Sequence, residues 1–172
     1  RVQAVTLRDV VGDHVTISQP KTTPLEMFDV ILMRQDPPFD MAYITATHLL
    51  EKLPKTTQVI NNPREVRNAP EKLLVTNFLD LMPPTLISSD LEKIMSFQAK
   101  YKDIIIKPLY GNGGAGVFRL QAHDQNLNSL MEMFSCISRE PLMIQAYLPE
   151  VRNGDKRIII VDGKAVGTIN RI

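Results

Sequence analysis

Apolar residues along the chain form two kinds of pattern, short extended runs and segments with helical spacing. The run Phe28–Met33 is almost continuously apolar, as expected of a strand that is buried on both faces. Between Phe39 and Leu53, apolar residues recur every three or four positions, which predicts a helix of about four turns. Strands are predicted over Val2–Leu7, Val10–Ile17, Phe28–Met33, Gln58–Ile60, Thr85–Ile87, Ile104–Lys107, Val117–Leu120, Leu142–Leu148, Arg157–Val161 and Ala165–Ile169.

Capping residues and prolines mark where the helices begin. Asn62 before Pro63 predicts a helix with Asn as its cap and Pro at the first helical position. A further helix is predicted after Pro70, and Ser89 with Glu92 predicts a capping box. Helices are thus predicted over Phe39–Leu53, from Pro63, from Pro70 with Leu73, Leu74, Phe78 and Leu81 on one side, from Ser89 to Tyr101, and over Leu127–Ile137.

The order of these elements bears on the fold class. From Thr85 onward it is strand, helix, strand, strand, helix, strand, strand, strand, which differs from the strict alternation of a doubly wound sheet. No internal repeat or low-complexity segment is present. We therefore expect a mixed α/β (α+β) protein.

Composition and charge exclude several classes of partner. The 172 residues carry 20 basic and 19 acidic side chains, so we expect no nucleic-acid partner, since binding to a phosphate backbone needs concentrated positive charge. The apolar run Ile104–Ile106 is too short to span a bilayer, and we expect no membrane segment and no signal peptide. A single cysteine, Cys136, fits a reducing cytosol, and its apolar neighbours predict a packed, non-catalytic thiol.

The stretch DIIIKPLYGNGGAGVFRL, from Asp103 to Leu120, contains the pattern G-x-G-x-x-G at Gly111, Gly113 and Gly116. In a dinucleotide-binding fold, the third glycine opens a helix. Here the following residues are β-branched and aromatic, and favour a strand. The glycines therefore join two strands, and the dinucleotide interpretation fails.

A glycine loop between strands lets backbone N–H groups close over a polyphosphate without interference from side chains. Lys107 ends the preceding strand, where its ammonium group could counter phosphate charge. The alternative is an ordinary glycine hairpin beside a solvated lysine. The number of glycines favours the phosphate loop, because ordering them costs conformational entropy.

Five segments of the chain carry a family resemblance. They are VILMRQDPPFD (Val30–Asp40), VINNPREVRNAPEKL (Val59–Leu73), DIIIKPLYGNGGAGVFR (Asp103–Arg119), QAYLPE (Gln145–Glu150) and NGDKRIIIVDGKAV (Asn153–Val166). Taken together, they resemble bacterial (prokaryotic-type) glutathione synthetase, of the ATP-grasp superfamily. The resemblance covers the whole chain, which corresponds to the middle of the family. The N- and C-terminal parts are lacking, so we expect a longer polypeptide.

The resemblance implies an ATP-grasp fold preceded by part of a Rossmann-like N-terminal (pre-ATP-grasp) domain. It implies three parts: residues 1–68 for the N-terminal substrate-binding domain, 69–144 for the central lid subdomain, and 145–172 for the start of the C-terminal subdomain. The implied activity joins γ-glutamylcysteine and glycine through an acyl phosphate, giving glutathione, ADP and phosphate. ATP, Mg²⁺ (with Mn²⁺ as an alternative), a cytoplasmic location and a homotetramer are implied as well. We expect the chain alone to be inactive.

The resemblance also assigns site residues. Lys72 and Lys107 correspond to the lysines that reach the α- and β-phosphates, and the metal ligands are expected beyond Ile172. Catalytic roles fall on Arg157 and Arg171, and substrate-binding roles on Arg34 and Asp36. The remaining nucleotide-binding residues are Gly111, Asn112, Gly113, Gly114 and Gly116 in the loop, Gln145, Ala146, Tyr147 and Leu148 in the segment that pairs with adenine, and Asp155.

Some of these residues also have plainer interpretations. Lys72 could be an ordinary exposed lysine on a helix. Asp155 and Arg157 lie two apart on a strand and so share a face, where they could serve one site or form a surface ion pair. At the level of the whole chain, the alternatives are an ATP-grasp ligase for another carboxylate and amine, and a non-catalytic nucleotide-binding module. The R-x-D-P-P-F-D string (Arg34–Asp40) favours the glutathione type.

Overall fold

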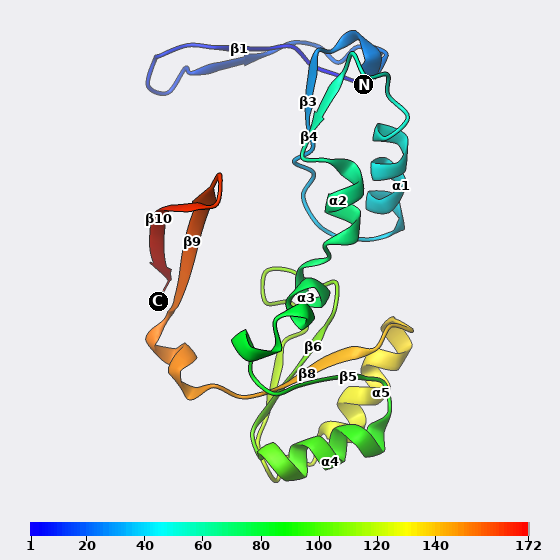
Figure 1. Cartoon of the computed structure of the whole chain (residues 1–172), viewed down its shortest axis with the longest axis vertical. Helices are drawn as coiled ribbons and strands as arrows, with labels where there is room; N and C mark the ends of the chain where they lie inside the picture. The colour runs from blue at the N-terminus through cyan, green and yellow to red at the C-terminus, as the bar shows by residue number, and fades with distance from the viewer. Residues whose placement is uncertain (172) are drawn as a thin grey trace. The chain divides into compact units, whose positions relative to one another are not determined.

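A computed structural model describes residues 1–171 of the chain and divides it into two compact units, Arg1–Pro70 and Glu71–Ile172 (Figure 1). Ile172, the last residue of the predicted C-terminal part, lies outside the described residues. Helices and strands are mixed in both units, which confirms the predicted α/β (α+β) class. No helix among the described residues is long and apolar enough to cross a membrane.

Unit 1 (residues 1–70) opens with an antiparallel hairpin of β1 (Val5–Leu7) and β2 (Val15–Ile17). The strand predicted from Val10 begins later, because the side chain of Arg8 closes a wide loop. Arg8 Nη2 donates to Asp13 Oδ1 over 2.6 Å, and the Arg8 N–H donates to the His14 carbonyl over 2.9 Å. The residues between are turn and loop. A 3₁₀ turn, η1 (Leu25–Met27), follows the hairpin.

After the hairpin and η1, unit 1 contains a β-α-β element, as part of a Rossmann-like domain requires, followed by a second helix. Strand β3 (Val30–Leu32) pairs in parallel with β4 (Gln58–Ile60), and α1 (Met41–Leu50) connects them. The predicted burial of β3 on both faces is wrong, since Leu32 is 63% exposed. Among the described residues β3 pairs only with β4, in a two-stranded sheet. The side chains of Val30 and Leu32, on one face of the strand, are therefore left exposed.

Helix α1 is shorter than its apolar spacing predicted. It starts after Asp40, whose carboxylate accepts the Tyr43 N–H over 2.9 Å, and it ends at Leu50. Leu53 therefore lies in the turn beyond the helix. The start of α2 (Pro63–Asn68) agrees with the prediction, because Asn62 Oδ1 accepts the N–H groups of residues 64 and 65 over 3.0 and 3.4 Å.

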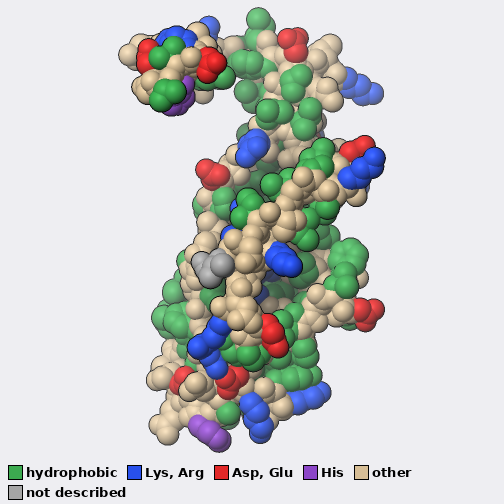
Figure 2. All heavy atoms as spheres, turned by 90° about the vertical axis from the view of Figure 1, so that its left-hand side faces the viewer, with side chains coloured by type: hydrophobic (Ala, Val, Ile, Leu, Met, Phe, Trp, Pro, Cys, Tyr) green, Lys and Arg blue, Asp and Glu red, His purple; other side chains and the backbone are tan. Residues whose placement is uncertain are grey.

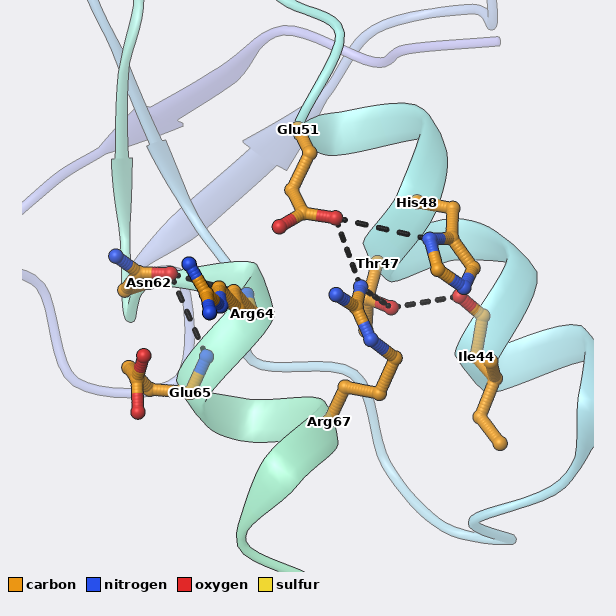
Figure 3. A network of polar contacts seen from close by, with 8 residues as sticks. All are labelled: Ile44, Thr47, His48, Glu51, Asn62, Arg64, Glu65 and Arg67. Carbon is orange, nitrogen blue, oxygen red and sulfur yellow. Dashed lines mark hydrogen bonds and ion pairs between the residues drawn. The ribbon is translucent and has the colours of Figure 1, made fainter.

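A polar network joins α1 to α2 (Figure 3). Thr47 is fully buried, donates to the Ile44 carbonyl over 2.6 Å and accepts from Arg67 Nη1 over 3.0 Å. Arg67 also forms a 2.8 Å ion pair with Glu51, which lies 3.6 Å from His48 Nδ1. The Arg67 guanidinium holds the pKa of the Glu51 carboxyl below its ordinary value. The sequence contained no clear signal for this network.

Unit 2 (residues 71–172) contains a four-stranded antiparallel sheet in the order β5-β8-β6-β7. Helices α4 (Leu91–Tyr101) and α5 (Leu127–Ile137) lie along one face of it (Figure 1). The core between helices and sheet is made of apolar side chains, and burying each stabilises the fold by about 1.5–3 kcal/mol. The strands are β5 (Thr85–Ser88), β6 (Ile104–Pro108), β7 (Phe118–Leu120) and β8 (Leu142–Ala146).

The predicted capping box at the start of α4 is wrong. Asp90 is the cap, and its Oδ1 accepts the N–H groups of Glu92 and Lys93 over 3.0 and 3.2 Å. A carboxylate at this position also interacts favourably with the helix dipole, which gives it an advantage over Ser89.

The helix predicted after Pro70 is broken up. It consists of α3 (Glu71–Leu74) and two 3₁₀ turns, η2 (Val75–Asn77) and η3 (Leu79–Leu81). The Thr76 hydroxyl donates to the Leu73 carbonyl over 2.6 Å, a local bond of the kind that competes with regular helix. Leu81, predicted on the apolar side, is 85% exposed.

The last elements are a 3₁₀ turn, η4 (Pro149–Asn153), and a hairpin of β9 (Asp155–Val161) and β10 (Lys164–Arg171). Asp162 and Gly163 have φ of 50° and 74°, so the predicted Asp-Gly turn is confirmed. The apolar side chains of this hairpin are exposed, and Figure 2 shows hydrophobic side chains reaching the surface among charged ones. The predicted boundary after residue 144 falls within β8.

Candidate nucleotide site

The register of the sheet in unit 2 places a set of polar side chains on the face away from α4 and α5. Ile104 and Ile106 are fully buried in the core under the helices. Because side chains alternate along a strand, Ile105 and Lys107 point to the opposite face. Gln145 lies opposite Ile105 in the neighbouring strand and shares that face.

A hydrogen-bonded chain crosses three strands of this face. Lys107 Nζ donates to Gln145 Oε1 over 2.6 Å. Gln145 Nε2 donates to Thr85 Oγ1 over 2.8 Å, and the Thr85 hydroxyl donates to the Pro83 carbonyl over 2.7 Å. The amide of Gln145 therefore fixes the direction of the half-buried Lys107 side chain. Thr85 was missed by the sequence analysis, because the strand Thr85–Ser88 has no alternation of polar and apolar residues that would mark a polar face.

Lys72, on α3, reaches the glycine loop. Its ammonium group donates to the Gly111 carbonyl over 2.5 Å and lies 3.4 Å from the Leu109 carbonyl. Burial, and then the nearby charge of Lys72, lower the pKa of Lys107, while Glu71 opposes the shift. In residues 1–171 neither ammonium group forms an ion pair. Both ammonium groups are hydrogen-bonded to neutral oxygens, each to its own, and such cations are well suited to receive a polyanion.

The glycine loop joins β6 to β7, as predicted from the residues that follow it. Gly113, Gly114 and Gly116 have φ of 61°, 80° and 72°, which other residues rarely adopt. A Cβ atom on Gly116 would come within 3.1 Å of Pro108, and one on Gly111 within 2.9 Å. Asn112 accepts the Ala115 N–H over 3.1 Å, which forms a turn inside the loop. The conformation and packing therefore both require glycine.

The segment predicted to pair with adenine ends β8. The N–H of Ala146 donates to the Pro84 carbonyl over 3.0 Å, and the N–H of Tyr147 to the Asp103 carbonyl over 2.9 Å. Both donors are therefore engaged within unit 2. The N–H of Leu148, in contrast, has no hydrogen-bond partner among the described residues. It is the backbone donor of this segment that a base could use.

Three predicted residues lie on one face of the β9–β10 hairpin. Asp155 is opposite Arg171 in the register, and Arg157 is two residues further along. Arg171 binds the Asp155 carboxylate with two donors, Nε at 2.9 Å from Oδ1 and Nη2 at Oδ2. This guanidinium lowers the pKa of Asp155. The ion pair suggested between Asp155 and Arg157 is therefore replaced by a pair across the strands.

Two of the predicted site residues lie outside unit 2. Arg34 and Asp36 belong to unit 1, where they are exposed in the loop between β3 and α1. In residues 1–171, no group of three or more His, Cys, Asp or Glu side chains is arranged to hold a metal ion. Cys136 is exposed, so the prediction of a packed thiol is wrong. It lies two positions after the buried Phe134 on α5, which puts it on another side of the helix, away from the core.

Comparison with protein families gives two matches. Residues 71–172 match the family described as "Prokaryotic glutathione synthetase, ATP-grasp domain", and residues 1–67 match "Prokaryotic glutathione synthetase, N-terminal domain". Among curated proteins, the chain is 57% identical over 172 residues to a glutathione synthetase of Brucella melitensis. The aligned region covers 100% of this chain and 55% of that protein. It is 57% identical over 171 residues to a glutathione synthetase of Agrobacterium fabrum, covering 99% and 54%. The chain thus spans about half the length of the curated relatives it matches.

Solved structures show the same fold at low sequence identity. A RimK domain ATP-grasp protein from Sphaerobacter thermophilus superposes with a TM-score of 0.64 at 17% identity, over 84% of this chain and 55% of that one. The D-cycloserine synthetase DcsG gives a TM-score of 0.62 at 17% identity, over 80% and 50%. The likeness to these structures is one of fold alone.

Proposed function

Because the chain belongs to the prokaryotic glutathione synthetase family, we propose that the polypeptide carrying it is an ATP-dependent ligase that joins γ-glutamylcysteine to glycine. One observation supports the nucleotide part of this proposal above the others. Lys72 and Lys107 place two ammonium groups without carboxylate partners beside a glycine loop, in the described part of the chain. Such a pair is stabilised when a polyphosphate replaces the neutral oxygens.

The nucleotide would lie along the strands of unit 2. The Leu148 N–H is the donor available to the base, and the two lysines with the N–H groups of the glycine loop would take the α- and β-phosphates. These groups leave the γ-phosphate to react. Binding of the base and of the α- and β-phosphates would then position the γ-phosphate for transfer. These contacts would be the same in the bound substrate and in the transition state.

The reaction proceeds in two balanced steps. A carboxylate oxygen of γ-glutamylcysteine attacks the γ-phosphorus, the bond to the β-phosphate oxygen breaks, and ADP leaves. The glycine amine then attacks the acyl carbon, loses its proton, and phosphate leaves as the amide forms. Negative charge builds up on the transferred phosphate and on the acyl oxygen, where cationic side chains stabilise it.

For this stabilisation we assign Arg157 and Arg171. Asp155 accepts two hydrogen bonds from Arg171, which fix the orientation of the guanidinium. The guanidinium stays positively charged near neutral pH. Arg34 and Asp36 are assigned to the dipeptide substrate, with the Arg34 guanidinium suited to a carboxylate. The cytoplasmic location and the homotetramer belong to the same proposal, as does the use of Mg²⁺ or Mn²⁺. Residues 1–171 contain no cluster of three or more His, Cys, Asp or Glu side chains that could hold this ion.

The proposal is tested by ADP release from the polypeptide that carries this sequence. ATP and a divalent cation are supplied with γ-glutamylcysteine and glycine, singly and together, and glutathione is quantified in parallel. We expect ADP and glutathione in equal amounts only when both substrates are present. ADP release with another carboxylate and amine instead would indicate a different ligase of the same fold. ATP binding without turnover under any of these conditions would indicate a nucleotide-binding module.

A further inference from the structure

Contacts from three directions meet at Tyr147, just after β8. Its backbone N–H donates to the Asp103 carbonyl over 2.9 Å. The Arg119 guanidinium lies 3.9 Å from the centre of the tyrosine ring, and Arg152 Nε donates to the hydroxyl over 3.2 Å. Arg119 in turn donates to the Asp103 carboxylate over 2.6 Å. Asp103, Arg119 and Tyr147 therefore form a closed triangle at one end of the sheet.

Packing alone does not hold the tyrosine ring. The triangle borders a cavity of about 520 Å³, which is also lined by Lys102, Gln121, Pro149 and Arg152. A ring beside such a cavity can change rotamer unless polar contacts prevent it. Arg119 over the ring and Arg152 at the hydroxyl are the contacts that do so.

The triangle by itself contributes little to the stability of the fold. The side chains of Arg119 and Asp103 are 30% and 32% exposed, and ion pairs with this exposure contribute little to the free energy of unfolding. Arg119 Nε is moreover buried without a hydrogen-bond partner in the described structure, which is a cost. The triangle thus costs free energy and lies beside the segment assigned to adenine. Both facts favour a role in positioning that segment.

From these contacts we infer that Asp103 and Arg119 are positioning residues for recognition of the nucleotide base, acting through Tyr147 on the Leu148 N–H. The peptide group that joins Tyr147 to Leu148 is planar, so the direction of its N–H follows the backbone of Tyr147. Hydrogen bonds weaken steeply when they are misaligned, and a loosened Tyr147 would misdirect this donor. The inference rests on the proposed function, because it takes residues 145–148 as the segment that pairs with adenine.

The test compares ligands that share the phosphates and differ in the base. Dissociation constants for ATP, GTP and inorganic tripolyphosphate are measured by calorimetry on the polypeptide that carries this sequence and on its Asp103→Asn and Arg119→Met variants. We expect ATP to bind roughly five- to tenfold more weakly in both variants, with tripolyphosphate unchanged. The preference for ATP over GTP falls by the same factor. In turnover, KM for ATP rises while kcat is nearly unchanged.

Matched variants separate positioning from general damage. Asp90→Asn removes a carboxylate from the same unit and keeps a helix cap, and should leave all three constants unchanged. Arg119→Lys keeps the charge without the planar group over the ring, so it should still lose preference for ATP. Tyr147→Phe keeps the ring under Arg119 and should retain most of the preference for ATP over GTP. Because Asp103 and Arg119 act as a unit, the double variant should lose no more than either single one.

The outcomes that overturn the inference are distinct from those that overturn the proposed function. Equal weakening of ATP and tripolyphosphate in the variants would mean that the triangle supports the whole unit, and no weakening of ATP would mean that it has no part in binding. Either result would leave the ligase assignment standing. Failure of the unsubstituted polypeptide to bind ATP would overturn the proposed function itself.

Discussion

Lys107 Nζ lies 2.6 Å from Gln145 Oε1, across the two central strands β6 and β8. The contact joins the residue assigned to the phosphates with the first residue of the adenine segment. One hydrogen bond thus couples the two halves of the proposed nucleotide site.

Replacing Lys107 by alanine in the polypeptide that carries this sequence should abolish ATP turnover and preserve the fold. The lysine is half-buried and its pKa is lowered, so its charge does not favour the folded state, whereas phosphate binding depends on it. ADP release and the far-UV circular dichroism spectrum measure the two effects. Lys55→Ala, at an exposed lysine of unit 1, is the control and should change neither. A folded Lys107→Ala variant with normal turnover would refute the assignment.

The same lowered pKa predicts a pH dependence. The folded chain binds the Lys107 proton less tightly than the unfolded chain, for which the ordinary value is 10.5. Charged Lys107 therefore destabilises the fold below its lowered pKa, and this penalty disappears as pH rises toward 10.5. ATP binding has the opposite dependence, because it needs the charged form. Affinity should fall as pH rises through the lowered pKa, at a pH where an ordinary lysine is still charged.

Calorimetric titrations with ATP from about pH 7 to about pH 10 measure this effect. Lys107→Arg keeps its charge over that range and should bind with a flatter pH profile, whatever its affinity at neutral pH. Identical profiles for the two proteins would show that another group titrates.

Substitutions of two glycines with similar backbone conformations should differ in cost. Gly12 and Gly116 have φ of 83° and 72°, but a Cβ atom on Gly12 would meet nothing within 4 Å, whereas one on Gly116 would meet Pro108. Gly12→Ala should lower the free energy of unfolding by about 1–2 kcal/mol through backbone strain alone. Gly116→Ala should lose a further 1–3 kcal/mol or so by overpacking, and should weaken ATP binding. Urea unfolding measures the difference, and equal losses would contradict it.

The polar network of unit 1 gives a fourth prediction. Thr47→Val keeps the shape of a fully buried side chain but removes the oxygen that accepts from Arg67 (Figure 3), and should cost about 1–3 kcal/mol of unfolding free energy. Thr45→Val is the matched control, since its hydroxyl also bonds a carbonyl of α1 but the residue is exposed. It should change the free energy by less than about 0.5 kcal/mol. Similar losses at both positions would mean that the network contributes no stability.

Local chemistry made much of the fold predictable. The strands around the glycine loop, the Asn62 cap and the Asp162-Gly163 turn follow from residues within a few positions of one another, and the structure has all three. Predictions that depended on burial were weaker. Leu32 and Cys136 are apolar by type but exposed, because burial depends on which elements pack nearby and not on the residue itself.

The candidate site shows the same division. The positions of Lys107 and Gln145 on one face could be read from strand alternation. The pairing of Asp155 with Arg171 could not, because it depends on the register of a hairpin that contains a bulge. The contact of Arg119 with Tyr147 links β7 to the residue after β8, two strands that are not neighbours in the sheet, and no spacing along the chain encodes it.

In the proposed site, β6 follows Asp103, which lies beside the segment assigned to the base, and carries Lys107, which is assigned to the phosphates. An extended chain rises about 3.4 Å per residue, which puts these two positions about 14 Å apart. If the proposed site is correct, the length of this one strand sets the distance between the residues that recognise the base and those that recognise the phosphates. Loss of a single residue from it would shorten that distance and turn Lys107 toward the helices, because strand faces alternate residue by residue. Such a change in length would be more damaging than most substitutions within the strand.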